Sequence, residues 1–162
     1  MTQFYTYIDV VTLGKLLLVS DGQALTGLYF ADKPHAPVPG AEWQEDATLK
    51  IFSTVHTQLH EYMTGARTTF TIPYRSAHGT SFQQNVWQAL AQVPYGATMS
   101  YQGLAALLGA PTSTRAVANA IARNPLSLVI PCHRIVGSNG SLTGYAGGLD
   151  RKKLLLTREQ RG

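Results

Sequence analysis

Residues 100–125 read SYQGLAALLGAPTSTRAVANAIARNP, a stretch that contains the start and stop signals of two short helices. Ser100 is a typical N-cap residue for a first helix over 101–108. The glycine and proline at 109–111 end that helix, because neither residue favours its continuation. The stretch therefore begins with a short helix and a tight turn.

The second helix of the stretch begins after this turn. Thr112 or Ser113 is placed to cap it, and it must end near Arg123 because Pro125 disfavours helical geometry at Asn124. Two short helices joined by a tight, glycine-containing turn predict a helix-turn-helix. Simple packing of two helices is the alternative that the pattern leaves open.

The surrounding residues complete a mostly helical C-terminal half. Apolar residues at helical spacing predict a helix through Ala91, capped by Thr80 or Ser81, and a last helix over 150–158. Between these helices lie an apolar run, two glycine-containing turns and the stretch Pro131-Cys132-His133-Arg134-Ile135. The only cysteine of the chain thus follows the predicted helix-turn-helix.

Charge divides the chain into two unlike halves. Residues 1–81 hold five Lys or Arg against seven Asp or Glu, a net charge of −2, whereas residues 82–162 hold eight against two, a net charge of +6. A basic surface is what binding to a polyanion requires. The C-terminal half is therefore the candidate nucleic-acid-binding part.

The N-terminal half has the pattern of a small α/β unit. Runs of β-favouring residues predict strands over 15–19, 28–30 and Thr68–Ile72. Apolar residues at helical spacing predict a helix over 47–64, which Gly65 ends.

Residues 76–80 are the best candidate for a linker, because the sign of the charge changes just after them. We therefore expect an N-terminal α/β domain over 1–75 and a C-terminal domain over 81–162. The length of 162 residues suits two small domains.

The apolar runs of the chain are far shorter than the roughly 18 residues that suggest a membrane-spanning helix. Residues 1–10 also lack the basic start of a secretory signal. We therefore expect a cytoplasmic protein that has no membrane partner.

A single cysteine, Cys132, excludes an internal disulfide and a thiolate-rich zinc cluster. His56 and His60 are four residues apart and could share a helix face, but no further ligand pair lies nearby in the sequence. We therefore expect no metal and no cofactor, with both histidines on a solvated helix face.

Cys132 itself has two interpretations. A lone cysteine is most often a small buried hydrophobic residue. The neighbours Pro131, His133 and Arg134 favour a reactive thiol instead, because adjacent cations lower the pKa of a thiol and a thiolate is a good nucleophile. If the segment is extended, adjacent side chains point to opposite faces, so we expect a water to relay the thiol proton to His133.

Several motifs stand together in the C-terminal half, in addition to the stretch 131–135. They are Gly79-Thr80-Ser81-Phe82-Gln83-Gln84-Asn85-Val86-Trp87, Pro94-Tyr95-Gly96, Ser100-Tyr101, Arg115-Ala116-Val117, Asn124-Pro125, Gly144-Tyr145-Ala146-Gly147-Gly148 and Glu159. This set resembles the O6-alkylguanine-DNA alkyltransferases, whereas the N-terminal half resembles them only in outline. The resemblance implies a small ribonuclease H-like α/β domain, followed by a mostly helical winged helix-turn-helix domain that carries the active-site cysteine.

The resemblance also implies a reaction. Cys132 would take the alkyl group from O6 of guanine, with O4-alkylthymine as a second substrate class that the sequence leaves open, and each molecule would react once. His133 and Glu159 would form a relay that removes the thiol proton through water, Tyr101 would protonate the departing guanine, and Asn124 would hold the second helix against the cysteine segment. Without the motifs, His133 and Glu159 read equally as a DNA-facing histidine and a solvated glutamate. Tyr101 then reads as a packed tyrosine and Asn124 as an ordinary turn residue before a proline.

Contacts with DNA follow from the same resemblance. Arg115 would enter the base stack in place of a flipped nucleotide, and Ala116 with its small neighbours would allow close approach to the minor groove. Tyr101 and Arg134 would also contact the DNA. Alanines at this spacing occur in simple helix packing as well. The expected partner is double-stranded DNA that contains alkylated bases, bound by a monomer that could assemble on DNA.

Guanine would be recognised by the glycine-rich loop, through Tyr145 and Ala146, with Ile121 and Ile135 as apolar walls. Ala146 departs from family members that have a serine there, so a hydroxyl contact is lost. Some members bind zinc in the first domain through cysteines that this chain lacks.

Three other functions compete with alkyl transfer. A non-catalytic alkyltransferase-like protein has another residue in place of the reactive cysteine and usually lacks the first domain. This chain has Cys132 and the pattern of a first domain, which argues against that function. A transcriptional regulator would need base-reading side chains on the second helix and a dimer interface. A cysteine hydrolase would turn over many substrate molecules.

Overall fold

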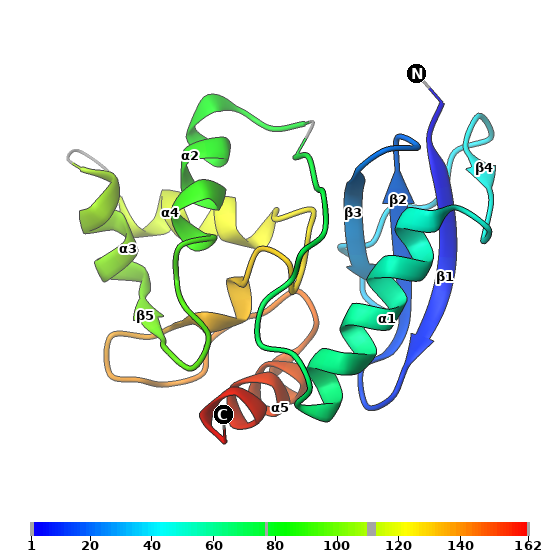
Figure 1. The fold of residues 1–162 in the computed structure, drawn as a ribbon. Helices are drawn as coiled ribbons and strands as arrows, with labels where there is room; N and C mark the ends of the chain where they lie inside the picture. Colours follow the sequence, from blue (N-terminus) through cyan, green and yellow to red (C-terminus); the bar gives the residue numbers. More distant parts are fainter. Residues whose placement is uncertain (1, 77, 110–112, 162) are drawn as a thin grey trace. The chain divides into compact units, whose positions relative to one another are not determined.

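The structure is a computed structural model that describes residues 2–76, 78–109 and 113–161 (Figure 1). The chain forms two compact units, Met1–Ala77 and His78–Gly162. The predicted linker over 76–80 includes Ala77, which lies outside the described residues, so the domain boundaries of the sequence analysis stay predictions. No described helix is both long and apolar enough to cross a membrane.

A four-stranded sheet forms the N-terminal unit (Figure 1). The strands β1 (Phe4–Val10), β2 (Gly14–Ser20) and β3 (Leu25–Phe30) are antiparallel neighbours, and β4 (Gln44–Glu45) pairs in parallel with β1, which gives the order β3-β2-β1-β4. The strands predicted over 15–19 and 28–30 are confirmed. We did not predict β4, because a strand of two residues shows no alternation.

A single helix, α1 (Lys50–Thr64), packs on β1 (Figure 1). Its buried apolar side chains are those of Ile51, Phe52, Val55, Leu59, Tyr62 and Met63. Gly65 ends the helix with a φ of 87°, a left-handed conformation that favours glycine. The helix begins three residues later than predicted, because the Asp46 carboxylate accepts hydrogen bonds from the backbone N–H and the hydroxyl of Thr48 and holds a turn there.

The predicted strand over Thr68–Ile72 is wrong. The side chain of Gln58 from α1 binds its backbone instead: Oε1 accepts from the Thr71 N–H at 2.9 Å, and Nε2 donates to the Thr71 carbonyl at 3.3 Å. The chain meets the sheet just afterwards, where Tyr74 forms an isolated bridge with Leu25. The Gln58 side chain thus makes the backbone hydrogen bonds of Thr71 that a neighbouring strand would otherwise make.

Three helices form the centre of the C-terminal unit: α2 (Ser81–Leu90), α3 (Tyr101–Leu108) and α4 (Thr114–Ala122). Their N-caps are Thr80, Ser100 and Ser113, whose side chains each accept a hydrogen bond from the backbone N–H three residues later. The predicted helices are therefore confirmed, and α3 and α4 pack against each other as a helix-turn-helix requires. The alternative cap Thr112 and residues 110–111 of the turn lie outside the described residues.

The remaining elements bring the cysteine segment to these helices. A 3₁₀ turn, η1 (Cys132–Arg134), leads into β6 (Ile135–Val136), which pairs in parallel with β5 (Met99–Ser100) at the start of α3. The last helix, α5 (Leu149–Gln160), follows the glycine-rich loop. The short β5-β6 ladder, which we did not predict, places η1 close to the first residues of α3.

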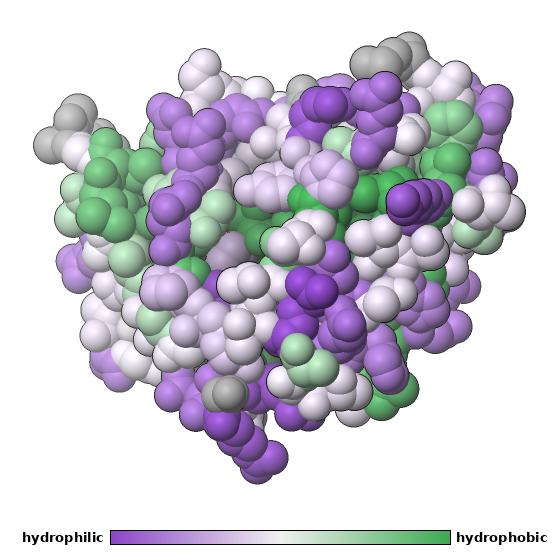
Figure 2. Space-filling model, viewed as in Figure 1, coloured by the Kyte–Doolittle hydropathy of each residue, from purple (hydrophilic) through white to green (hydrophobic). Residues whose placement is uncertain are grey.

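The surface of this unit is not uniformly polar. Figure 2 shows hydrophilic residues over much of the visible face and apolar residues gathered over α3. Leu107 on α3 is 67% exposed.

Candidate active site

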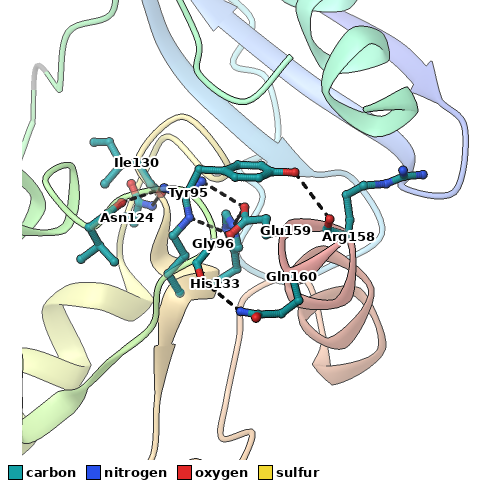
Figure 3. A network of polar contacts seen from close by, with 10 residues as sticks. Tyr95, Gly96, Asn124, Ile130, His133, Arg158, Glu159 and Gln160 are labelled. Carbon is teal, nitrogen blue, oxygen red and sulfur yellow. Dashed lines mark hydrogen bonds and ion pairs between the residues drawn. The ribbon is translucent and has the colours of Figure 1, made fainter. Parts of the chain in front are cut away.

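The segment that precedes Cys132 is fixed to the end of α4 by one side chain. Asn124 donates from Nδ2 to the Ile130 carbonyl at 2.9 Å, and its Oδ1 accepts from the Leu126 N–H at 3.0 Å (Figure 3). Asn124 is buried, so both bonds lie in the interior. Leu128, between the two anchored residues, has a φ of 73°, a left-handed conformation that is rare for a leucine. The two hydrogen bonds of Asn124 therefore fix the backbone conformation of the segment that leads to Cys132.

Cys132 is a buried thiol at the start of η1. Burial raises its pKa, although a hydrogen bond with Asn124 and the positive charge of Lys152 act in the opposite direction. This corrects the expectation of a lowered pKa: the cations near a buried thiol do not offset the loss of solvation. Cys132 therefore needs a base to remove its proton.

His133, the residue that follows Cys132, forms a buried pair with Glu159. The distance between His133 Nε2 and Glu159 Oε2 is 2.6 Å, and both side chains are 1% exposed (Figure 3). Burial lowers the pKa of His133 more than Glu159 raises it, so the imidazole is neutral at neutral pH. Because Nε2 faces a carboxylate, it carries the ring proton, and Nδ1 has a free lone pair. Nδ1 is buried and has no hydrogen-bond partner within the described part of the protein.

The side chain of Arg134 contacts the carboxylate of Glu159 in the same pair. Its Nε donates to Glu159 Oε1 at 2.8 Å, its Nη2 to Glu159 Oε2 at 3.0 Å, and its Nη1 to the Val93 carbonyl at 2.7 Å. The guanidinium also lies 5.7 Å from the centroid of the Tyr95 ring. This placement argues against the predicted DNA contact of Arg134, because its donor groups are directed to interior acceptors.

Lys152 is a residue that our sequence analysis missed. Its side chain is fully buried in α5, and Nζ donates to the carbonyls of Thr143 at 3.0 Å and Gly144 at 3.4 Å. Burial lowers its pKa, whereas its interaction with Cys132 raises it. Lys152 and Glu159 are seven residues apart on one helix face, a spacing that could have indicated a shared site.

A cavity of about 900 Å³ opens over Cys132. The predicted residues that line it are Tyr101, Arg115, Ile121, Cys132, Tyr145 and Ala146, and the unpredicted ones include Gln102, Thr114, Ser138 and Thr143. Ile135 is not among its lining residues and is fully buried in β6, which argues against its role as a wall. Ala116 also does not line the cavity, although Ala118 and Ala122 of the same helix do.

Tyr101 places a hydroxyl at this cavity from the first turn of α3. The hydroxyl is 3.5 Å from the Gly144 carbonyl and accepts a hydrogen bond from the Thr143 hydroxyl at 3.2 Å. Lys152 Nζ lies 5.9 Å from the centroid of the Tyr101 ring. The Tyr101 hydroxyl at the cavity and the buried Lys152 cation thus lie close to each other.

The described residues contain no cluster of three or more His, Cys, Asp or Glu side chains that could hold a metal ion. The Nε2 atom of His56 lies 3.2 Å from the carbonyl oxygen of Asp9. The expectation of no metal and no cofactor stays a prediction.

Comparison with known proteins matches both halves of the chain to one family. Residues 3–75 match the family model described as 6-O-methylguanine DNA methyltransferase, ribonuclease-like domain, and residues 81–161 match the DNA binding domain of the same family. The chain belongs to the 6-O-methylguanine DNA methyltransferase family. The site that contains Cys132 therefore lies in the DNA-binding domain of this methyltransferase family.

Individual relatives agree over nearly the whole chain. The methylated-DNA–protein-cysteine methyltransferase of Haemophilus influenzae is 38% identical over 97% of this chain and 86% of its own, and that of Methanosarcina barkeri is 40% identical over 95% and 97%. The crystal structure of the Mycobacterium tuberculosis O6-methylguanine methyltransferase, 39% identical, has a TM-score of 0.86 and covers 98% of this chain and 93% of its own. A crystal structure of the M. tuberculosis protein in complex with DNA, 37% identical, has a TM-score of 0.85 and covers 99% and 94%. The predicted two-domain fold of the methyltransferase family is thus confirmed.

Proposed function

We propose that this protein repairs double-stranded DNA by moving the alkyl group of O6-alkylguanine onto its own Cys132. The observation that carries the proposal is the placement of this cysteine: it lines a cavity, and the buried pair of His133 and Glu159 directly follows it. Family membership supports the reaction, because the relatives named above are methylated-DNA–protein-cysteine methyltransferases.

The chemical step is a displacement at the alkyl carbon. The Cys132 sulfur forms a bond to this carbon while the bond between the carbon and O6 breaks, and the electron pair of that bond leaves with guanine. The thiol proton passes through a water to Nδ1 of His133, whose Nε2–H stays directed to Glu159. The product is a thioether, which water does not hydrolyse, so one molecule removes one alkyl group.

Tyr101 completes the proton balance. A guanine that leaves with an electron pair carries developing negative charge, and a proton from the Tyr101 hydroxyl neutralises it. His133 gains one proton and Tyr101 loses one, so the site as a whole keeps its charge. The hydroxyl is at the cavity and is oriented by Thr143, which supports this role.

Binding requires that the damaged base leave the duplex, because Cys132 is buried and lines a cavity of the protein. Arg115 is exposed on α4 and lines the same cavity, where it would replace the flipped nucleotide in the base stack. Ala116, Ala118 and Ala122 make α4 narrow enough to approach the minor groove closely. Arg134 is not included among the proposed DNA contacts.

The base would be held by the glycine-rich loop and α4. Tyr145 and Ala146 line one part of the cavity and Ile121 lines another. Without a hydroxyl at Ala146, recognition there depends on backbone groups. O4-alkylthymine is a second proposed substrate, because a cavity of this size has room for either flipped base.

The proposed acting form is a monomer in the cytoplasm. Every residue that lines the cavity comes from the unit His78–Gly162 of one chain, so the site needs no second subunit.

The test is a stoichiometric transfer assay. A known amount of protein is mixed with an excess of duplex DNA that contains O6-methylguanine labelled in its methyl group. We expect the label on Cys132, with a plateau near one methyl group per protein, and no transfer to Cys132→Ser. Continuous turnover would indicate a hydrolase, and binding of the lesion without transfer would indicate a non-catalytic lesion-binding protein; either result would refute the proposal.

A further inference from the structure

Glu159 lies between two partners, and this arrangement determines the charge of the site. Its Oε2 accepts from both His133 Nε2 and Arg134 Nη2, and its Oε1 accepts from Arg134 Nε. An arginine side chain is always charged in a protein, so the buried carboxylate already has a counter-ion before His133 is considered. A carboxylate with two planar hydrogen bonds from a guanidinium is strongly held in its ionised form.

We propose that Arg134 is a positioning residue that serves as the counter-ion of Glu159, so that His133 enters the reaction as a neutral imidazole whose Nδ1 can accept the Cys132 proton. The inference rests on the proposed function and explains a side chain that this function does not use directly. Arg134 touches neither the cavity nor, in the proposed mechanism, the DNA.

The charges around His133 decide whether its imidazole can accept a proton. A buried carboxylate without a counter-ion draws a proton to a neighbouring imidazole, and a protonated His133 has no lone pair left for the thiol proton. With Arg134 in place, Glu159 orients the ring and fixes the proton on Nε2. The positive charge of Arg134 lowers the pKa of His133, in the same direction as burial.

The other groups that face His133 do not replace this effect. Lys152 of α5 also lowers the pKa of His133, but its Nζ donates to the carbonyls of Thr143 and Gly144. Cys132 precedes His133 in η1. The centroid of the Tyr145 ring lies 6.4 Å from the centroid of the His133 ring, in an edge contact. Among these groups, Arg134 is the cation that is hydrogen-bonded to Glu159.

The position of Arg134 is held from outside the pair as well. The Val93 carbonyl accepts from Nη1, and the Tyr95 ring lies against the guanidinium. Tyr95 and Gly96 are in turn tied to α5: the Tyr95 hydroxyl lies 3.5 Å from the Arg158 carbonyl, and Gln160 Nε2 donates to the Gly96 carbonyl at 3.1 Å (Figure 3). The segment after α2 therefore keeps both Arg134 and the helix that carries Glu159 in place.

The test measures the titration of His133 directly, by NMR of the imidazole C–H groups in the full-length protein, with His133→Gln to assign the signal. In Arg134→Gln, which keeps a hydrogen-bond donor and removes the charge, we expect the midpoint of His133 to rise by about one pH unit or more. In Arg134→Lys, which keeps the charge, it should stay close to the wild-type value. Arg161→Gln removes the same charge from the exposed end of α5 and should have no effect.

Three results would overturn the inference: an unchanged or lowered midpoint in Arg134→Gln, a raised midpoint in Arg134→Lys, or a midpoint in the Arg134→Gln, Glu159→Gln double variant that stays as high as in the single variant. If Arg134→Gln does not fold, the Arg134→Lys titration still decides. The NMR titration needs no DNA, so failure of the methyl-transfer assay leaves it interpretable. If transfer does occur, the acid limb of its pH-rate profile should move upward with the His133 midpoint.

Discussion

A thiol that is buried for protection from solvent is also harder to ionise, and the residues around Cys132 oppose this effect. Asn124 binds the cysteine segment, Lys152 contributes positive charge, and His133 is the proposed base. Burial outweighs these effects and raises the pKa of the thiol, so Cys132 stays in its thiol form until a proton acceptor is engaged. This order of events suits a protein that is consumed in one reaction.

The charge of Lys152 can be separated from its position. Lys152→Met keeps most of the side-chain volume and removes the cation near Cys132, so the pKa of the thiol should rise and thiolate formation should move to higher pH. The measurement is the rate of Cys132 modification by iodoacetamide as a function of pH. Lys153→Met, an exposed neighbour on α5, should leave the profile unchanged. Identical profiles for wild type and Lys152→Met would contradict this role.

Asn124 is expected to contribute to stability as well as to the position of Cys132. Asn124→Ala leaves the Leu126 N–H and the Ile130 carbonyl without their side-chain partner in the interior, and this should lower the free energy of unfolding by about 1–3 kcal/mol. Urea unfolding measures the loss. The control is Asn119→Ala on the exposed side of α4, which should change stability little. Equal losses in the two variants would show that the buried bonds carry no particular weight.

Individual residues were predictable to different degrees. Cys132, His133 and Glu159 follow from a motif, and the structure brings the last two within hydrogen-bond distance. The direction of Arg134 and the burial of Lys152 do not follow, because an isolated sequence reads both as surface cations. Their burial depends on acceptors that are distant in the chain, such as Glu159 for Arg134.

At the scale of the secondary-structure elements, the N-cap residues are the clearest local signals of where a helix begins. Residue type and spacing predict Ser100 as a cap and offer Thr80 and Ser113 each as one of two candidates, and the helices begin directly after these three residues. The two-residue strands β4, β5 and β6 have no comparable signal, because their pairing is decided by distant segments. The strand predicted over 68–72 was wrong for the same reason, because the Gln58 side chain, which is distant in the sequence, binds the backbone of this segment.

The capping box of α2 gives a prediction at this scale. Thr80 accepts from the Gln83 N–H at 3.1 Å, and Gln83 Oε1 accepts from the Thr80 N–H at 3.0 Å. Thr80→Ala should lower the free energy of unfolding by about 0.5–2 kcal/mol, whereas Thr80→Ser keeps the hydroxyl and should lose much less. Thermal or urea unfolding distinguishes the two variants. A serine variant as unstable as the alanine variant would mean that the methyl group, not the hydroxyl, carries the effect.

At the scale of the whole molecule, the sequence predicted two units because charge and pattern change together near residue 80. The structure has two compact units, and the cavity and its buried pair belong wholly to the second. No described residue of the first unit lines the cavity. The net charge of +6 in residues 82–162 therefore belongs to the same part of the chain as Cys132.

This distribution of charge predicts a salt dependence that is specific to one unit. Binding of DNA releases counter-ions, so the logarithm of the binding constant should fall steeply and linearly with the logarithm of the salt concentration. Arg115 and Arg123 are exposed cations of α4 and its C-cap, and replacing both with alanine should make the slope shallower by roughly one to two. Fluorescence anisotropy with an undamaged duplex at several salt concentrations measures the slope.

The matched control replaces Lys15 and Lys50 with alanine, which removes the same charge from exposed positions in the unit Met1–Ala77. If DNA binding depends on the cations of the second unit, this variant should keep the wild-type slope, because its two lost charges were never neutralised by phosphate. An equal flattening in both double variants would mean that the long-range field of the whole chain governs binding, and the assignment of α4 as the DNA-binding helix would then have to be abandoned.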